Sequence, residues 1–295
     1  MMAKLKLKAG GFALTAAVLA CALVLGHHLW DYYVNAPWTR DGKVTADVVR
    51  VAPEVSGPIQ TVYVTDNQLV QAGDVLFEIS KERFQLALKA AQADLDTARE
   101  TMTFKQSQAT RNATLREKGS TSQENAEQAT QEAAAAKAAY RSAEVALDIA
   151  KLNLERTTVR APVTGYVTNL HLRQGDYAMA GTATVALLDA DSFRVTGYFR
   201  ETQLARIEVG DPVRIGLMGT RNDLSGHIES FGRGIADSNT ASNAQGLPSV
   251  EPVFTWVRLA QRIPVRIGID EVPDGMALAA GMTASVTVED SASGA

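Results

Sequence analysis

The sequence predicts an elongated, multidomain α+β chain with an N-terminal transmembrane helix, a split β-sandwich, an antiparallel coiled-coil α-hairpin and a β-barrel. Three observations lead to this fold class. Two stretches with the same strand-and-turn pattern occur far apart, around Gly57 and Gly165. Two apolar heptad patterns fill the interval between them, and strand-like alternation follows the second stretch.

Composition excludes several classes of function. The chain has 295 residues, 46% of them hydrophobic, which is enough for one large domain or for two or three small ones. A net charge of -4 argues against a nucleic-acid binder, because such proteins need a basic face to neutralise phosphates. The single cysteine, Cys21, excludes an intrachain disulfide and a cysteine metal cluster.

The N-terminus is predicted to anchor the chain in a membrane. Residues 1–8 form a short tail, and the uncharged run in residues 9–30 is just long enough to cross the hydrocarbon as a helix. The flanking residues that orient it are three lysines before the run (Lys4, Lys6, Lys8) and three aromatics after it (Trp30, Tyr32, Tyr33). The positive-inside rule then leaves the tail in the cytoplasm and the rest of the chain outside.

Two other interpretations of this run stay open. It could be a cleaved signal peptide, although no small-residue cleavage site follows it before the aromatic residues. Alternatively "VLAC" at 18–21 could be a lipoprotein processing box, although four more apolar residues follow Cys21. All three interpretations export the bulk of the chain. Residues 31–43 are expected to be a linker.

Residues 44–80 and 157–189 are predicted to be two halves of one β-sandwich. "APEVSGPI" at 52–59 and "APVTGYV" at 161–167 begin the same pattern, in which apolar positions and turn glycines match at a constant offset. The matched pairs are Ile59 with Val167, Val62 with Leu170, Val64 with Leu172, Gly73 with Gly181, Phe77 with Val185 and Ile79 with Leu187. A half of about 35 residues cannot bury a core alone, so the two halves are expected to pack together.

Residues 81–156, between the halves, are predicted to form the coiled-coil hairpin. Apolar residues follow heptad spacing in both arms: Phe84, Leu88, Ala91, Leu95, Ala98 and Met102, then Ala126, Ala129, Ala133, Ala136, Tyr140, Ala143, Leu147, Ala150 and Leu154. Gly119 is expected to end the first helix, and Thr121 with Glu124 to start the second as a capping box. Each arm would be on the order of 50 Å long.

Residues 190–290 are predicted to form a small β-barrel, followed by a C-terminal tail at 291–295. Four segments alternate apolar and polar residues: "SFRVTGYF" from 192, "DPVRIGLMG" from 211, "RIPVRIGI" from 262 and "GMTASVTVED" from 281. A polar loop occupies residues 237–250.

The repeated phrases, together with "VQAGDVLFEI" at 70–79, resemble the split lipoyl-like signature of HlyD-family membrane fusion proteins, the periplasmic adaptors of tripartite export systems. The resemblance covers residues 9–290. The short hairpin, the aromatic stretch after the anchor and "WVRLAQRIPVRI" at 256–267 are most similar to adaptor subunits of p-hydroxybenzoic acid efflux pumps.

The resemblance implies a set of partners and a docking site. Adaptors of this kind carry an Arg-x3-Leu-x6-Ser pattern at the hairpin tip, by which they bind a TolC-type outer-membrane channel. Arg111, Leu115 and Ser122 match that pattern. A leucine at a solvent-facing tip suits a partner groove, while Arg and Ser supply directional hydrogen bonds. The alternative is that Leu115 closes the hairpin and Ser122 belongs to the helix cap.

The resemblance also implies an inner-membrane transporter partner, of aromatic acid exporter or major-facilitator type, and a homo-oligomer of three or six copies that assembles through the lipoyl-like modules. Its cargo would be small aromatic carboxylic acids. No cofactor, metal or catalytic residue is expected. The sequence contains no ATP-binding motif, so energy would come from the transporter.

Two functions of other classes fit the sequence less well. A lipoyl or biotin carrier would need a modified lysine at a tight turn between the halves, but Lys81 opens a helix instead. A coiled-coil structural protein of the envelope would have no need of the split β module.

Overall fold

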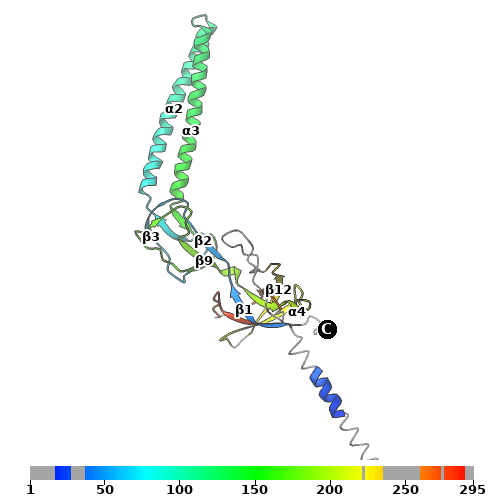
Figure 1. Ribbon diagram of the computed structural model, residues 1–295. Helices are drawn as coiled ribbons and strands as arrows, with labels where there is room; N and C mark the ends of the chain where they lie inside the picture. The colour runs from blue at the N-terminus through cyan, green and yellow to red at the C-terminus, as the bar shows by residue number, and fades with distance from the viewer. Residues whose placement is uncertain (1–16, 28–36, 221–222, 235–259, 274–275, 290–295) are drawn as a thin grey trace, which may run out of the picture. The chain divides into compact units, whose positions relative to one another are not determined.

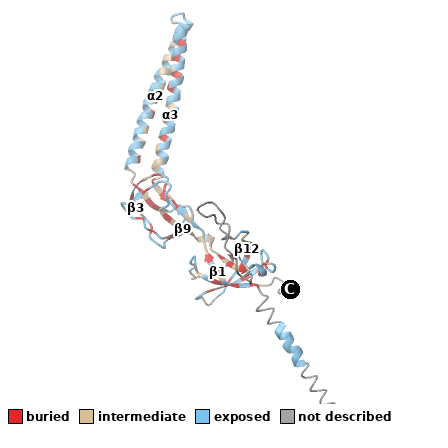
Figure 2. Cartoon of the chain, viewed as in Figure 1, coloured by how far each residue is buried: buried red, intermediate tan, exposed pale blue. Residues whose placement is uncertain are grey.

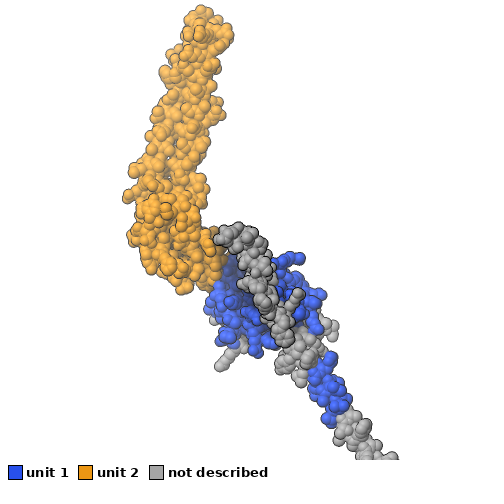
Figure 3. Space-filling model, in the orientation of Figure 1, with its two compact units in different colours: residues 1–47, 192–295 blue, residues 48–191 orange. Residues whose placement is uncertain are grey.

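The computed structural model describes residues 17–27, 37–220, 223–234, 260–273 and 276–289. The chain divides into two compact units, residues 48–191 and the segments on either side of them (Figure 3). Each unit has its own hydrophobic core, so the two are described separately.

The unit formed by the flanking segments contains a closed antiparallel β-barrel. In spatial order its strands are β1 (Trp38–Thr45), β10 (Arg194–Arg200), β13 (Arg262–Ile269), β12 (Leu224–Phe231), β11 (Pro212–Leu217) and β14 (Thr283–Val288). A 3-10 turn, η2 (Ala190–Ser192), precedes β10, and a short helix, α4 (Glu201–Leu204), follows it. Apolar residues at alternate strand positions point inward, among them Phe199, Ile215 and Ile267, each 0% exposed. The predicted barrel is confirmed.

Strand β1 was not expected from the sequence. Residues 38–43 were assigned to the linker and 44–45 to the first sandwich half, but all of them lie in the barrel, where β1 pairs with β10 and β14. The segment "WTRDGKVT" contains Asp41-Gly42, which reads as a turn. The segment forms a strand because it closes the barrel, which would otherwise have two unpaired edges. A bulge between Thr39 and Gly42 accommodates the Asp-Gly pair within the strand.

An ion pair joins the points where the chain leaves this unit and returns to it. Both guanidinium nitrogens of Arg194, at the start of β10, donate to the carboxylate of Asp47, just after β1, over 3.0 and 2.6 Å. The hydrogen bond from Arg194 lowers the pKa of Asp47 below its usual value. This two-pronged contact fixes the two chain ends between which residues 48–191 are inserted.

The inserted unit begins with two four-stranded antiparallel sheets. The first has the order β2 (Val48–Val51), β9 (Val185–Asp189), β7 (Gly165–Thr168), β4 (Leu69–Val70), and the second β6 (Thr158–Arg160), β5 (Val75–Ile79), β3 (Gly57–Val62), β8 (Tyr177–Ala178). Each sheet takes two strands from each half of the repeat. Neither sheet can therefore form until both halves are present.

The repeat extends to individual hydrogen bonds. Asn67 N–H donates to Val167 O over 2.9 Å, and at the equivalent place in the other half Gly175 N–H donates to Ile59 O over 3.0 Å. Both donors have positive φ, 61° at Asn67 and 92° at Gly175. When Gly57 is aligned with Gly165, each strand of one sheet corresponds to a strand of the other sheet, in the same order. The internal duplication is therefore confirmed.

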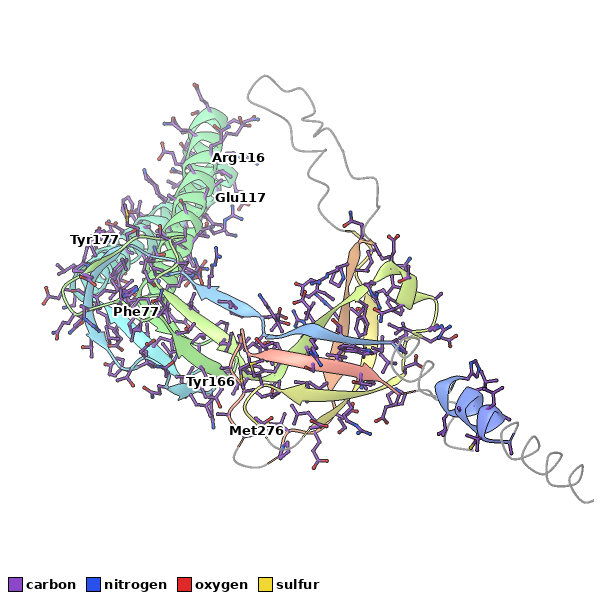
Figure 4. All side chains as sticks on the ribbon, turned by 60° about the horizontal axis from the view of Figure 1, so that its bottom comes forward. Phe77, Arg116, Glu117, Tyr166, Tyr177 and Met276 are labelled. Atoms are coloured by element: carbon purple, nitrogen blue, oxygen red, sulfur yellow. The ribbon has the colours of Figure 1, made fainter. Side chains whose placement is uncertain are left out.

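The core of this sandwich includes most of the apolar residues that the sequence alignment of the halves paired. Ile59, Phe77, Ile79, Val167 and Leu187 are all 3% exposed or less. Figure 4 shows Phe77 among the strands of the sandwich. Fully burying side chains of this size contributes about 1.5–3 kcal/mol each, so this core stabilises the base from which the hairpin leaves.

The hairpin consists of α2 (Glu82–Glu117) and α3 (Gln123–Glu155), which lie side by side along their length (Figure 1). The predicted heptad seams are confirmed: Phe84, Leu95, Ala126, Ala129, Ala133, Ala136 and Leu147 are buried, and the other predicted seam residues are half-buried. Figure 2 shows the two helices largely exposed, with scattered buried and intermediate residues along them. Small alanines in α3 permit close approach of the two helices.

Two polar contacts set the register of the hairpin. Lys105 Nζ lies 2.7 Å from Glu132 Oε2, and the Arg99 guanidinium lies 5.9 Å from the centroid of the Tyr140 ring. The hydrogen bond from Lys105 lowers the pKa of Glu132. Lys105 continues the apolar seam of α2, so a polar pair at this level disfavours sliding of one helix past the other.

Half of the predicted anchor, residues 9–16 and 28–30, lies outside the described residues. Residues 17–27 are helical and exposed, with Val18, Leu19, Leu23, Val24 and Leu25 each more than half exposed. Within the described ranges, no helix is both long and apolar enough to span a bilayer. The flanking residues Lys4, Lys6, Lys8, Trp30, Tyr32 and Tyr33 fall outside those ranges, as does the predicted tail at 291–295.

Candidate docking site at the hairpin tip

Helix α2 ends in a glycine-dependent cap. Gly119 adopts φ +71°, Gly119 N–H donates to Arg116 O over 2.9 Å, and Ser120 N–H donates to Leu115 O over 2.8 Å. This pair of bonds is a Schellman motif, which glycine favours because a side chain at positive φ is strained. The expectation that Gly119 ends the helix is confirmed. The motif also fixes the backbone position of Leu115, whose carbonyl is part of it.

Helix α3 begins one residue later than predicted. The N-cap is Ser122, whose Oγ accepts a hydrogen bond from Asn125 N–H over 3.2 Å, so the expected capping box of Thr121 and Glu124 is wrong. Ser and Thr are both good N-cap residues, and the connection between the helices decides which of the two neighbours takes the place. Ser122 therefore serves the cap, although the residue is exposed to solvent.

Arg111 and Leu115 lie on one face of the last turns of α2. They line an open groove of about 460 Å³ with Gln106, Ser107, Thr110 and Thr114. Leu115 is an apolar side chain among mostly polar neighbours at the tip, and it is 37% exposed. Figure 4 labels the next two residues, Arg116 and Glu117, which are also exposed. Two of the three predicted tip residues thus share a surface, and Ser122 lies across the turn from it.

The hydroxyl residues of this groove were not singled out from the sequence. Thr110 Oγ1 donates to Gln106 O over 3.0 Å, and Thr114 Oγ1 donates to Thr110 O over 3.1 Å. Each hydroxyl thus donates to the carbonyl of its own helix four residues earlier. Thr110 and Thr114 stand four residues apart beside Arg111 and Leu115, a spacing from which the sequence could have revealed a shared face.

The side chains of the tip groove are of kinds that contact other proteins. Among the described residues, no three His, Cys, Asp or Glu side chains come together in a way that could hold a metal ion. The groove provides an apolar side chain, a cation and hydroxyls, which suit recognition of a protein surface.

Lys81 lies at the start of a helix, whereas a lysine that carries a cofactor would lie on a tight turn between the two halves. It is the N-cap residue of α2, and its Nζ lies 2.8 Å from Glu78 Oε1. The hydrogen bond from Lys81 lowers the pKa of Glu78. Paired with a neighbouring carboxylate at the start of a 36-residue helix, this lysine is not presented on a tight turn.

Replacing Ser122 by alanine should loosen the first turn of α3. Loss of an N-cap acceptor costs about 1 kcal/mol, so hydrogen exchange of the Asn125 amide should speed up about fivefold. Ser122→Asp, which retains an acceptor, is the matched control and should leave the exchange rate near that of the unaltered chain. Equal exchange rates for the alanine and aspartate variants would contradict the cap.

Comparison with protein families gives two matches that together span the described units. Residues 47–190 match the family described as "RND MFP, barrel-sandwich hybrid domain", and residues 192–289 match the "AAEA-like beta-barrel domain". The boundary between the matches coincides with the point where the chain re-enters the barrel unit.

Similar proteins are found among both sequences and solved structures. A relative in Escherichia coli strain K12, described as "Uncharacterized protein YdhJ", is 42% identical over 274 residues, which is 93% of this chain and 96% of the relative. The membrane fusion protein Spr0693 from Streptococcus pneumoniae R6 has a TM-score of 0.62 and 18% identity, covering 85% of this chain and 97% of its own.

A MacA-MexA chimera carrying the Pseudomonas aeruginosa MexA α-hairpin has a TM-score of 0.60 and 21% identity, covering 86% of this chain and 81% of its own. The similarity to these solved structures shows the fold alone. The relative with 42% identity and the two domain matches show the family. The chain belongs to the membrane fusion proteins, the family of non-enzymatic periplasmic adaptors that serve efflux systems of the cell envelope between an inner-membrane transporter and an outer-membrane channel.

Proposed function

We propose that this adaptor is held in the inner membrane by a single span within residues 9–30 and docks by its hairpin tip onto a TolC-type outer-membrane channel. The barrel and anchor would contact the transporter, and export would proceed through the sealed duct with energy from the transporter. The lipoyl-like sandwich would join three or six copies into a ring.

The observation that carries the docking proposal is the exposed Leu115 beside Arg111 on the groove at the tip. An apolar side chain surrounded by polar groups gains by leaving water, and a guanidinium beside it can donate to carbonyl or carboxylate oxygens of a partner. Ser122 supplies a further hydroxyl on the other side of the turn. The tip is held rigid by the Schellman motif and by the α3 cap, which lowers the entropy lost on binding.

The proposed anchor is supported by the part of it that is described. Residues 17–27 form a helix whose valines and leucines face outward without packing partners in either core. Exposed aliphatic side chains around a helix suit a hydrocarbon environment better than water. Lys4, Lys6 and Lys8 would keep the preceding tail in the cytoplasm, and Trp30, Tyr32 and Tyr33 would lie at the outer interface.

The proposed cargo is small aromatic carboxylic acids such as p-hydroxybenzoate, and the proposed transporter is an aromatic acid exporter. This proposal follows from the resemblance in the sequence, including the segment at 256–267. A major-facilitator multidrug exporter is the second candidate for the transporter. Accumulation of p-hydroxybenzoate, but not of a cationic drug, in cells lacking the adaptor is expected for the first candidate. The reverse pattern is expected for the second.

Affinity capture of the full chain from crosslinked cell envelopes tests the proposal. An inner-membrane exporter and an outer-membrane channel should co-purify with the chain. Leu115→Asp should lose the channel and retain the exporter, because the variant alters only the tip. Recovery of neither partner would overturn the adaptor arrangement, and unchanged recovery of the channel with Leu115→Asp would overturn docking by the tip.

A further inference from the structure

A second pocket lies on the outer face of the β-barrel, in strands β1, β10 and β13 and helix α4. It encloses about 490 Å³ and is lined mainly by two aromatic residues, three arginines and a glutamine: Trp38, Tyr198, Arg40, Arg200, Arg262 and Gln203. All of these residues belong to the same compact unit. Positions 38, 40, 198 and 200 alternate with the buried Thr39 and Phe199, so their side chains point away from the barrel core. Docking by the hairpin tip uses none of them.

Two neighbouring strands each carry an aromatic residue followed two positions later by an arginine. Strand β1 has Trp38 and Arg40, and β10 has Tyr198 and Arg200. Thr39 Oγ1 donates to Tyr198 O over 2.8 Å, which holds the two pairs next to each other. The Arg40 guanidinium lies 5.3 Å from the centroid of the Trp38 ring. The pocket therefore sets flat apolar surfaces directly beside positive charge.

The arginines of the pocket are only partly neutralised. Arg262 donates to the carboxylate of Asp41, whereas Arg40 and Arg200 have no carboxylate partner among the described residues. Arg200 and Arg262 also lie directly opposite each other in the pairing of β10 with β13. Like charges at opposite positions of an antiparallel pair destabilise a sheet. An anion bound beside these two arginines would relieve that repulsion.

A buried glutamine restrains the two strands that carry the site. Gln203 is 8% exposed. Its Oε1 accepts a hydrogen bond from Arg200 N–H over 3.2 Å, and its Nε2 donates to Trp38 O over 3.3 Å. The buried amide thus bonds to the backbone of both strands. A pocket whose walls are held in this way loses less entropy when a ligand binds.

These groups fit a small aromatic carboxylate better than other small ligands. A guanidinium can donate two parallel hydrogen bonds to a carboxylate, and aromatic side chains pack against a planar ring. An inorganic anion would use the arginines and leave the aromatic surfaces unused, whereas a cation would be repelled. The volume of the pocket is in the range of those that hold one small ligand.

We propose that this pocket binds small aromatic carboxylic acids, with Arg200 and Arg40 donating to the carboxylate and Trp38 and Tyr198 contacting the ring. The proposal rests on the cargo proposed above and adds to it a binding site on the adaptor itself. Trp38 follows Trp30, at the end of the proposed span, by eight residues, so it lies within about 28 Å of that end. Cargo would thus be bound close to the membrane in which the transporter lies.

Equilibrium dialysis of the full chain in neutral detergent against labelled p-hydroxybenzoate tests the site. Binding should saturate at one ligand per chain. Arg200→Gln should weaken it about ten- to a hundredfold, because hydrogen bonds between two charged groups are lost. The variant should fold as well as the unaltered chain, since it removes one member of the like-charge pair with Arg262. An unchanged affinity in this variant would overturn the proposal.

Three further variants separate geometry, packing and net charge. Arg200→Lys keeps the charge but cannot donate two parallel hydrogen bonds, so its affinity should fall between those of arginine and glutamine. Trp38→Leu should weaken binding because it removes a flat surface. Arg233→Gln is the matched control, at an exposed arginine of the same unit that does not line the pocket, and should bind normally. Equal losses with Arg233→Gln and Arg200→Gln would mean that net charge alone attracts the ligand, and the site would be wrong.

A series of ligands provides an independent test of the same site. p-Hydroxybenzamide, which has a similar shape without the charge, should not compete with p-hydroxybenzoate, and cyclohexanecarboxylate, which has no aromatic ring, should compete weakly. Displacement by an equal concentration of inorganic phosphate would identify a general anion site and contradict the proposal. Displacement by phosphatidylglycerol added to the detergent would identify a site for lipid headgroups and contradict it as well.

Failure of this site can be separated from failure of the proposed function. If cells that lack the adaptor accumulate p-hydroxybenzoate but the purified chain does not bind it, the site is wrong and the proposed cargo stands. If the purified chain binds p-hydroxybenzoate through Arg200 but cells without the adaptor export it normally, the site stands and the proposed cargo is wrong.

Discussion

Replacement of Leu115 by aspartate is expected to abolish export while leaving the fold and the amount of protein in the envelope unchanged. The side chain is exposed on the tip groove, so the change costs little in the free protein. In a docked complex the new carboxylate would have to lose water without a partner, which costs several kcal/mol. A loss of only 3 kcal/mol would weaken binding by more than a hundredfold.

The measurement is intracellular accumulation of the exported compound in cells that carry only the variant adaptor. Arg111→Asp, on the same groove, should have a similar effect because it reverses the charge of the hydrogen-bond donor. Ser120→Asp is the matched control, since it adds the same charge to the turn at an exposed residue that does not line the groove. Normal export with both Leu115→Asp and Arg111→Asp would show that the tip does not dock in this way.

Replacement of Gly165 by alanine is expected to be among the most destabilising single changes in the sandwich. A Cβ at this position would lie 2.3 Å from Leu188 O and 2.9 Å from its carbonyl carbon. These are backbone atoms of β9, the strand paired with β7, so the clash can be relieved only by separating two central strands. We expect a loss of about 3 kcal/mol in the free energy of unfolding, at the upper end for overpacked sites.

Gly57 provides an internal control, because it occupies the equivalent position in the other half of the repeat. A Cβ there would lie 2.6 Å from Ile79 Cγ2, so the clash is with one buried side chain, and it meets no backbone atom within 4 Å. Gly57→Ala should therefore cost less than Gly165→Ala in chemical denaturation of the purified protein. Equal losses for the two variants would mean that the clash with β9 is not what limits position 165.

The tip was only partly predictable. The resemblance predicted Arg111, Leu115 and Ser122 as tip residues, and the four-residue spacing of Arg111 and Leu115 was enough to expect both on one helix face. The structure places Arg111 and Leu115 on one groove and gives Ser122 a second task as the cap of α3. Thr110 and Thr114 were missed because threonines at exposed helix positions look like ordinary polar surface residues in a sequence, although their spacing places them beside Arg111 and Leu115.

The sequence by itself determined the parts whose signals are local or periodic. The heptad seams, the Gly119 stop and the matched halves of the sandwich each follow from spacing along the chain, since helix and strand periods fix which side chains share a face. The tertiary structure decided what depends on pairing between distant segments. The sequence of strand β1 indicates a linker with an Asp-Gly turn. In the structure this segment is the sixth strand of the barrel, between β10 and β14. Likewise each sheet of the sandwich takes strands from both halves of the repeat. The order of residues does not show which strands pair, because the partners that satisfy the backbone hydrogen bonds are distant in the sequence.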